Sequence, residues 1–429
     1  MRTSAQIRTA SVIVAGVLGA TLLAATQPQP ADAARACRID VTTRLDLTEK
    51  FANNGATKYY WATSDGSAVG QYDHAANVIM TTFPLGATPQ LMYKRIGERQ
   101  AIGAMAQAQY PEALGAINAD FFVFADIRGT NDIEMARGPM VKAGQVIRGT
   151  SRDSRVVGLD STMQPYGGEL SVKGFTQAQT GSAPRIGLKS VNWHQILDGG
   201  VNVYTPDWSN AKNGAGTVLY PRPAGAVEWV VNGRNKVKSV RTAGSSLLGA
   251  PVAAGTRVLA FSADVVAQVP TVAVGTKVRV NIKQQTTTGV TLDTAVGRGL
   301  ELVNAGKPAP LGCRAYAQTG GAVSSRPRMF VGWDAKGRWR SFTVPGTRVY
   351  LKNGSSLQRE GGMGLASAAN VAKSLGMSYA YELDGGGSTS LWTRTGSQWG
   401  RKDLYGMSVQ SGCACERWMA NGLSFVAGP

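Results

Sequence analysis

The segment Leu383–Trp392, LDGGGSTSLW, places one acid, three glycines and several hydroxyl groups within a few positions. Glycine adopts left-handed backbone conformations at little cost, so consecutive glycine N–H groups can converge on one anion. Ser388 and Thr389 would add hydroxyl donors. The pattern suits a phosphate, although it lacks the lysine of a Walker loop and the spacing of a dinucleotide fingerprint. A tight turn with only a structural role is the alternative.

Asp384 directly precedes these glycines. A carboxylate beside an anion site is repelled unless it is protonated, holds a metal, or faces a different atom of the ligand. A sugar joined through phosphate offers both partners, because the phosphate fits the glycines and the anomeric carbon fits the carboxylate. We therefore expect this segment to bind a sugar phosphate, with the carboxylate facing the anomeric carbon.

A second polar group interrupts the apolar segment Ala113–Phe124, ALGAINADFFVF, which predicts a buried strand. Asn118 and Asp120 are two residues apart, so they project to the same face of that strand. Burying them without partners would be costly. They are candidates for the same site, and the alternative is that they cap a turn at the strand end.

Three further side chains are candidates because of their type. Arg328 stands at the start of a predicted strand, where a guanidinium can hold a phosphate or carboxylate with two hydrogen bonds. Arg417 and Asn421 interrupt the closing apolar strand expected over 418–426. A surface position is the alternative for Arg328.

Composition and charge limit the class of protein. The 429 residues are 43% hydrophobic and 17% charged, which is typical of a folded globular protein. The net charge of +18 indicates anionic partners: nucleic acid, lipid or a cell-wall polymer. Nucleic acid is the weaker explanation, because lysine and arginine are spread along the chain and no zinc-finger spacing occurs.

Residues 1–33 resemble an export signal. A basic start with Arg2 and Arg8 precedes the apolar segment 11–25, which is too short to span a bilayer. The Ala31–Ala33 stretch fits a cleavage site. We expect a secreted, cell-wall-associated protein without stable membrane insertion; a retained N-terminal anchor is the alternative.

The cysteines of an exported protein are expected to form disulfides. An even number of cysteines in an oxidising compartment indicates two disulfides. A bridge across the pair that is separated by one residue would be strained, so we expect the first two cysteines each to reach this C-terminal pair. A metal site lacks histidines at ligand spacing. The cysteines are Cys37, Cys313, Cys413 and Cys415, and the histidines are His74 and His194.

Hydrophobic periodicity predicts an α+β fold with a β-rich segment near 221–310. Helices are expected over 91–110 and 364–375, the latter ending at Gly376. Strands are expected over 37–47, 113–124, 378–383 and 418–426, with strand pairs over 138–147 and 329–344. The glycine turn thus follows a helix and a strand.

Taken in order, these segments resemble the phosphodiester glycosidase family from Leu114 onward. The matching motifs are ALGAINADFF, GPMVKAGQVI, AVGRGLELVNAGK, RPRMFVGWDAKGRW, LDGGGSTSLW and ERWMANGL. Arg298 and Met329 depart from the family pattern. The resemblance implies mixed, layered β-sheets with flanking helices in a domain over 111–429, preceded by a signal over 1–33 and a region of unknown role over 34–110.

The resemblance implies a hydrolase that cleaves a sugar-1-phosphodiester at the anomeric C–O bond. The export signal and the positive charge add the expectation that it is secreted and acts on a cell-wall or exopolysaccharide glycan. Asp384 and Asp120 would be the catalytic carboxylates, with no cofactor or with a divalent cation such as calcium between them. Glu382 would pair with a nearby arginine instead. A non-catalytic module that binds anionic, phosphate-containing wall glycans is the alternative. The expected substrate-binding residues are Asn118, Arg328, Gly385, Gly386, Gly387, Ser388, Thr389, Arg417 and Asn421.

Overall fold

The protein is mainly β in the parts that the structure describes. The computed structural model describes residues 45–49, 57–64, 76–95, 98–122, 135–194, 196–208, 226–242, 252–310, 327–344, 347–350, 357–360, 363–402 and 418–428. These residues form four sheets, with α2 (Ile102–Gln109), α4 (Leu365–Ser374) and short 3-10 segments η1 (Ala263–Gln268) and η2 (Gly386–Ser388). The expected α+β class therefore overstated the helical content, while the β-rich middle is confirmed.

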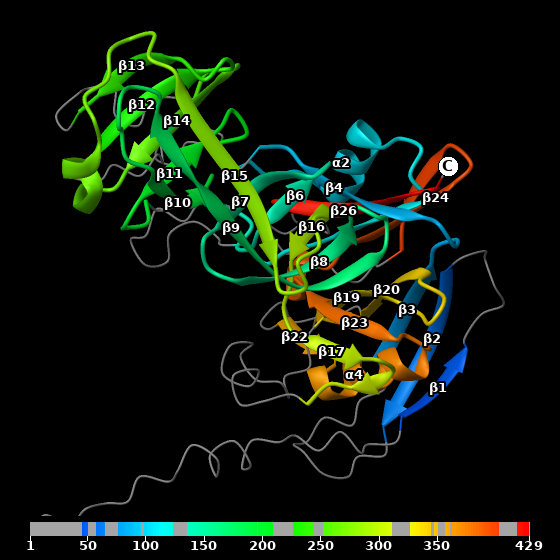
Figure 1. Cartoon of the computed structure of the whole chain (residues 1–429). Helices are drawn as coiled ribbons and strands as arrows, with labels where there is room; N and C mark the ends of the chain where they lie inside the picture. The colour runs from blue at the N-terminus through cyan, green and yellow to red at the C-terminus, as the bar shows by residue number, and fades with distance from the viewer. Residues whose placement is uncertain are drawn as a thin grey trace, which may run out of the picture.

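An eight-stranded antiparallel sheet carries helix α4 on one face (Figure 1). Successive residues of a strand point to opposite faces, and the residues of β19 follow this rule. Phe330 packs with Leu365 and Val371 of α4, whereas Val331 packs toward the next sheet. The strand order is β1 (Leu45–Glu49), β2 (Thr57–Ser64), β3 (Ala76–Thr82), β20 (Trp339–Val344), β19 (Arg328–Trp333), β23 (Tyr379–Leu383), β17 (Glu301–Asn304) and β18 (Lys307–Pro308).

A five-stranded antiparallel sheet forms the next layer. Ile117 and Leu423 of this sheet share a buried cluster with Val331 of the first sheet and with Ile102 and Met105 of α2. Burial of these apolar side chains between the two sheets and α2, together with the packing of α4 on the first sheet, holds the layers together. The strand order is β25 (Gln398–Arg401), β24 (Leu391–Thr395), β5 (Gly115–Asn118), β26 (Asn421–Val426) and β4 (Thr88–Tyr93).

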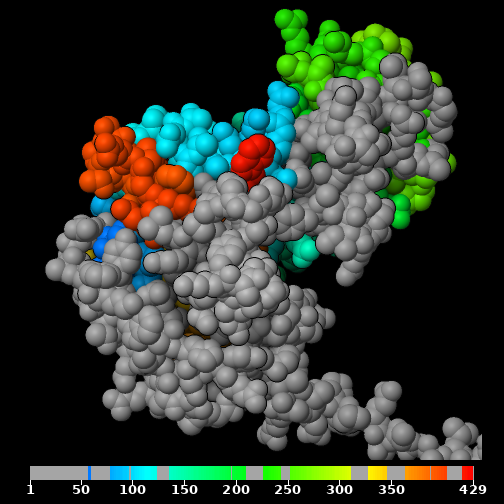
Figure 2. Space-filling model, turned by 180° about the vertical axis from the view of Figure 1, so that it is seen from behind, coloured from blue at the N-terminus to red at the C-terminus, as the bar shows by residue number. Residues whose placement is uncertain are grey.

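An eleven-stranded sheet extends from this layered part, and its strands β12 to β14 form a projecting lobe (Figures 1 and 2). Its pairings are antiparallel except β10 with β11, and β10 also pairs with β9. The order is β13 (Val237–Arg241), β12 (Val227–Asn232), β14 (Thr256–Phe261), β11 (Val201–Tyr204), β10 (Ile186–Val191), β7 (Gln145–Thr150), β6 (Met140–Lys142), β16 (Leu292–Gly297), β8 (Ser154–Asp160), β9 (Pro165–Ala178) and β15 (Val278–Thr286). A separate hairpin joins β21 (Thr347–Tyr350) and β22 (Leu357–Glu360).

The helix expected over 91–110 is wrong in its first half. Leu91 belongs to β4, where it pairs with Leu423 of β26, and α2 begins only at Ile102. Pairing with a strand from the far end of the chain outweighs the local helical pattern, because both leucines become fully buried. Strands before residue 110 are thus hydrogen-bonded to strands near the C-terminus.

The segments with clear turn residues were predicted correctly. Ala143 and Gly144 have φ of 48° and 73°, as a two-residue hairpin between β6 and β7 requires. Gly337 has φ of 77° in the turn before β20, and Gly376 has φ of 74° just past α4. The expected first strand begins at Leu45 within the described residues, and its earlier part lies outside them.

Candidate active site

The end of β5 lies against the glycine turn. Asn118 is fully buried; its Nδ2 donates to the Asp384 carbonyl at 2.7 Å, and its Oδ1 accepts the Ser390 N–H at 2.9 Å. The Ala119 carbonyl accepts the Asp384 N–H at 2.9 Å. One buried amide side chain therefore fixes both ends of the turn. Its expected contact with a sugar stays a prediction.

The glycine turn differs from the expected anion-binding loop. Gly386 has φ of 63°, and its N–H donates to the Pro327 carbonyl at 2.8 Å. The Ser388 N–H donates to the Gly385 carbonyl at 3.2 Å, which closes the 3-10 turn η2. The three glycine N–H groups therefore do not all converge on one ligand. The amides of Gly385 and Gly387 remain the candidates for that purpose.

Asp120 lies beside Asp384 and is almost fully buried. Its Oδ2 accepts the Gly138 N–H, and its own N–H donates to Asn421 Oδ1 at 3.0 Å. Burial raises the pKa of Asp120 to about 7; the Gly138 N–H and the Arg148 charge oppose the rise, and the Asp384 charge adds to it. Asp120 can therefore take up or release a proton near neutral pH.

Two glycines allow the chain to approach the Asp120 carboxylate closely. A Cβ added at Gly297 would lie 2.7 Å from the Gly138 Cα and still closer to Asp120 Oδ2. A Cβ added at Gly138 would lie 2.8 Å from the same oxygen. The hairpin start and the end of β16 thus enclose Asp120 and keep water from it, which accounts for the desolvation that raises its pKa.

Two buried polar atoms on residues of this region lack hydrogen-bond partners. Thr389 Oγ1 and Asn421 Nδ2 are on residues that are 1% and 0% exposed, and neither atom has a partner in the described part of the chain. Unsatisfied buried polar groups cost about 1–3 kcal/mol each. A polar ligand or an ordered water would satisfy both. Ser388 and Asp384 belong to the same region, with Ser388 buried and Asp384 half-buried.

Arg328 is close to the turn in the chain but directs its side chain elsewhere. Its Nη1 lies 3.0 Å from Glu382 Oε1 in a buried ion pair, and its Nε donates to the Met363 carbonyl at 3.2 Å. It shares a face of β19 with Phe330, which packs on α4. The expected pairing of Glu382 with an arginine is confirmed. Arg328 as a phosphate ligand stays a prediction, and in this conformation a phosphate would compete with Glu382.

The departures from the family pattern are accommodated by packing. Met329 is fully buried in the cluster between the two layered sheets. Arg298 lies over the Tyr381 ring, with 4.3 Å between its Cζ and the ring centroid, and its Nε donates to the Val156 carbonyl at 3.1 Å. Burial lowers the pKa of Arg298. Both side chains therefore have contacts within the protein that explain their presence.

Sequence reasoning missed Arg148. This side chain is 1% exposed; it donates to the Asn192 carbonyl at 2.7 Å, lies 3.3 Å from His194 Nδ1 and stacks over Trp193. Its charge lowers the pKa of Asp120. An arginine in the apolar strand QVIRGT was the available signal, because a buried cation requires partners.

Some expected features lie outside the described residues. These are Arg417 and the four cysteines, Cys37, Cys313, Cys413 and Cys415, so the proposed disulfides are not described. Within the described residues, no cluster of three or more histidine, cysteine, aspartate or glutamate side chains is suited to a metal ion. The divalent cation considered for Asp120 and Asp384 stays a prediction.

Comparison with known proteins shows a family match over part of the chain. Residues 225–426 match the family model described as phosphodiester glycosidase, which confirms the resemblance over this part of the chain. No curated protein sequence matches. No helix in the described residues is long and apolar enough to cross a membrane.

Solved structures share the fold at low identity. A hypothetical protein from Synechocystis is 18% identical with a TM-score of 0.60, over 90% of this chain and 68% of that one. A protein from Burkholderia pseudomallei, described as a candidate exported protein, is 17% identical with a TM-score of 0.59, over 85% and 76%. The catalytic domain of zebrafish N-acetylglucosamine-1-phosphodiester alpha-N-acetylglucosaminidase, auto-inhibited by its pro-peptide, is 14% identical with a TM-score of 0.43, over 91% and 92%.

Proposed function

We propose that this chain, whose residues 225–426 match the phosphodiester glycosidase family model, is a hydrolase that cleaves a sugar-1-phosphodiester between the anomeric carbon and the phosphate oxygen. The single observation that carries the proposal is that the Asp384 N–H bonds to the carbonyl of Ala119, the residue before Asp120, while burial raises the pKa of the Asp120 carboxyl group to about 7. Most enzymes that hydrolyse glycosides use two carboxyl groups that lie in different environments.

The leaving group shapes the roles of the two carboxyl groups. A phosphate monoester has a second pKa of about 6, so it leaves readily and needs little help from a general acid. The anomeric C–O bond breaks, water supplies the new oxygen, and the products are the free sugar and a phosphate monoester. We assign Asp384 to water activation or nucleophilic attack. Hydrolysis frees one proton from the water, and Asp120, with its pKa near neutrality, would accept that proton and release it to solvent.

The turn and its neighbours would hold the phosphate and the sugar. The amides of Gly385 and Gly387 and the hydroxyl of Ser388 are assigned to the phosphate. Thr389 Oγ1 and Asn421 Nδ2, which have no hydrogen-bond partner among the described residues, are assigned to ligand oxygens. These donors would stabilise the charge that develops on the leaving phosphate.

Export and domain organisation belong to the same proposal. We place a signal over 1–33, a region of unassigned role over 34–110 and the hydrolase domain over 111–429. After loss of residues 1–33 the chain would carry a net charge of +17, because two arginines and one aspartate leave. Such a charge would draw the protein to anionic wall or exopolysaccharide glycans.

Water labelled with heavy oxygen tests the bond that is cleaved. Hydrolysis of a sugar-1-phosphodiester in this water should place the label in the sugar, because water adds to the anomeric carbon. Label in the phosphate would show P–O cleavage and would refute the proposal. Binding without any hydrolysis would favour the alternative of a glycan-binding module.

A further inference from the structure

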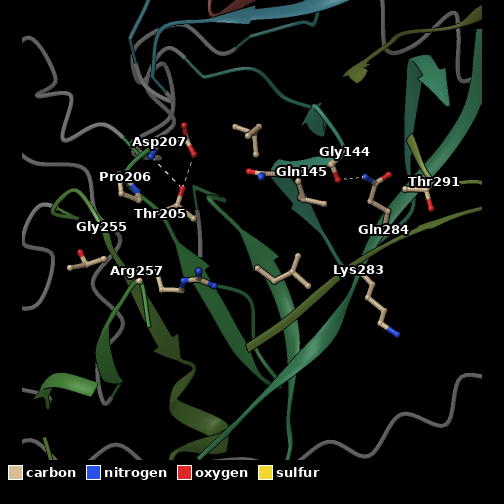
Figure 3. Close-up of a pocket in the computed structure, with 15 residues that line it drawn as sticks. Gly144, Gln145, Thr205, Pro206, Asp207, Gly255, Arg257, Lys283, Gln284 and Thr291 are labelled. Carbon is tan, nitrogen blue, oxygen red and sulfur yellow. Dashed lines mark hydrogen bonds between the residues drawn. The ribbon is translucent and has the colours of Figure 1, made fainter. Parts of the chain in front are cut away.

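A separate cavity of about 680 Å³ lies in the eleven-stranded sheet (Figure 3). It is bounded by the β6–β7 turn, the residues after β11, the start of β14 and the middle of β15. This volume falls within the range of small-molecule sites. The residues assigned to catalysis do not line it.

The cavity has a lining separate from the candidate active site. Ile147 lines the cavity, whereas Asn118, Asp120 and Asp384 do not. The next residue of β7, Arg148, acts on the charge of Asp120 and does not line the cavity. A ligand in the cavity would therefore occupy a second site and would not extend the first.

Arg257 gives the cavity its positive charge. Figure 3 shows its side chain, which comes from the start of β14, among the residues that line the cavity. The side chain is half-buried, and its guanidinium has no hydrogen-bond or ion-pair partner in the described part of the chain. Burial lowers the pKa of Arg257, with no charged neighbour contributing. A desolvated guanidinium without a counter-charge favours an anion.

The acid that lines the cavity is engaged elsewhere. Asp207 Oδ1 accepts the Tyr93 hydroxyl at 2.7 Å, and its Oδ2 accepts the Thr205 hydroxyl at 3.1 Å. Burial lowers the pKa of Lys142, and the charge of Asp207 opposes that effect, so Asp207 also interacts with this cation. The charge of Asp207 makes no contribution at Arg257, whose pKa is lowered by burial alone. Lys283, which is exposed, points away from these groups in Figure 3.

The rest of the lining suits a hydroxylated ligand. Gln145 and Thr291 are exposed polar side chains, and Gly144 and Gly233 present backbone without side chains. Ile282 and other aliphatic residues add apolar surface. Sugars carry both hydroxyl groups and an apolar ring face, so their chemistry matches this mixture.

We propose that this cavity is a second binding site, for an acidic saccharide whose carboxylate or phosphate pairs with Arg257. The guanidinium would hold the acid group through two parallel hydrogen bonds. The site would bind acidic glycan independently of hydrolysis at Asp384. It would bind an anionic polymer at a specific site, whereas the net charge of the protein provides only non-specific attraction.

Ligand-observed NMR titration of the purified protein tests the site with four probes: glucuronate, glucose 1-phosphate, inorganic phosphate and neutral glucose. We expect the acidic sugars to bind more tightly than glucose. Arg257→Gln should weaken their binding at least about tenfold, since a charge-assisted hydrogen bond is lost. Arg279→Gln is the matched control, because this exposed arginine of β15 does not line the cavity, and it should bind as the wild type does.

The results distinguish a uronic acid from a sugar phosphate as the ligand, and some of them would refute the proposed site. Tighter binding of glucuronate than of glucose 1-phosphate would identify a uronic acid, and the reverse a sugar phosphate. Unchanged affinity in Arg257→Gln, equal binding of glucose and glucuronate, or no binding of any probe would each overturn the site. If Arg257→Gln fails to fold, Arg257→Lys replaces it, and it should weaken binding several-fold because the planar fork is lost. The readout is binding, so the result does not depend on the hydrolase activity.

Discussion

The buried carboxyl group of Asp120 should make the stability of the protein depend on pH in a defined direction. The folded-state pKa of about 7 is about three units above the ordinary value of 3.8. The native protein therefore holds a proton that the unfolded chain has already released between about pH 4 and about pH 7. Stability from this group is fully present below about pH 4 and is lost as pH rises through about 7.

The size of the effect follows from the same difference. Three units correspond to about 4 kcal/mol, at about 1.4 kcal/mol for each pH unit. Asp120→Asn keeps the shape and an oxygen for the Gly138 N–H, but it has no charge to bury. The free energy of unfolding of the variant relative to that of the wild type should therefore increase as pH rises from about 4 to about 7. Above about pH 7 this difference should stay constant.

Urea unfolding of both proteins from about pH 4.5 to about pH 8.5 measures this difference. Asp334→Asn is the control. Side-chain and backbone hydrogen bonds from Arg338 outweigh the burial of Asp334 and lower its pKa. Its stability contribution is present above about pH 4 and is lost only below it, so this control should show a constant difference over the range. A wild-type-to-Asp120→Asn difference that is flat, or that changes in the opposite direction, would refute the assignment of a raised pKa.

Two further substitutions test the surroundings of the site. Gly297→Ala should destabilise the protein by about 1–3 kcal/mol and lower activity, because the new Cβ meets Asp120; Gly187→Ala, with open space around it, should be nearly neutral in the same unfolding and activity assays. Arg328→Met should cost about 3–5 kcal/mol by leaving Glu382 buried and charged, and adding Glu382→Gln should recover most of that loss in urea unfolding. Equal stability of the Arg328→Met single and double variants would contradict the buried ion pair.

Local sequence was sufficient where turn residues and periodicity agreed. The β6–β7 turn at Ala143 and Gly144, the turn at Gly337 and the helix end at Gly376 all have the positive φ that their residues suggested. The alternation in β19 likewise reflects two buried faces, one toward α4 and one toward the five-stranded sheet. In these segments short-range preferences and the final packing favour the same conformation.

Long-range contacts explain what the sequence did not reveal. The strand at Leu91 forms because β26 pairs with it, and the order of strands in the sheets depends on residues hundreds of positions apart. Arg148 approaches the charge of Asp120 only through the fold of β7. The Gly386 N–H donates to the carbonyl of Pro327, which directly precedes β19. Because this contact joins residues far apart in the chain, the glycine pattern alone does not reveal it. Residue types identified the candidates, and tertiary structure decided their partners.

The most direct test of the proposed hydrolase is release of free sugar from a panel of sugar-1-phosphodiesters, UDP-N-acetylglucosamine among them, by the wild type and by Asp384→Asn. We predict release by the wild type and a loss of at least about a hundredfold in the variant, because the carboxylate that acts on water or the anomeric carbon is gone. Ligand binding should persist in Asp384→Asn, since Asn118 holds the carbonyl and N–H of the turn and not the Asp384 side chain. Undiminished release by the variant, or no release by the wild type alongside retained glycan binding, would contradict the account.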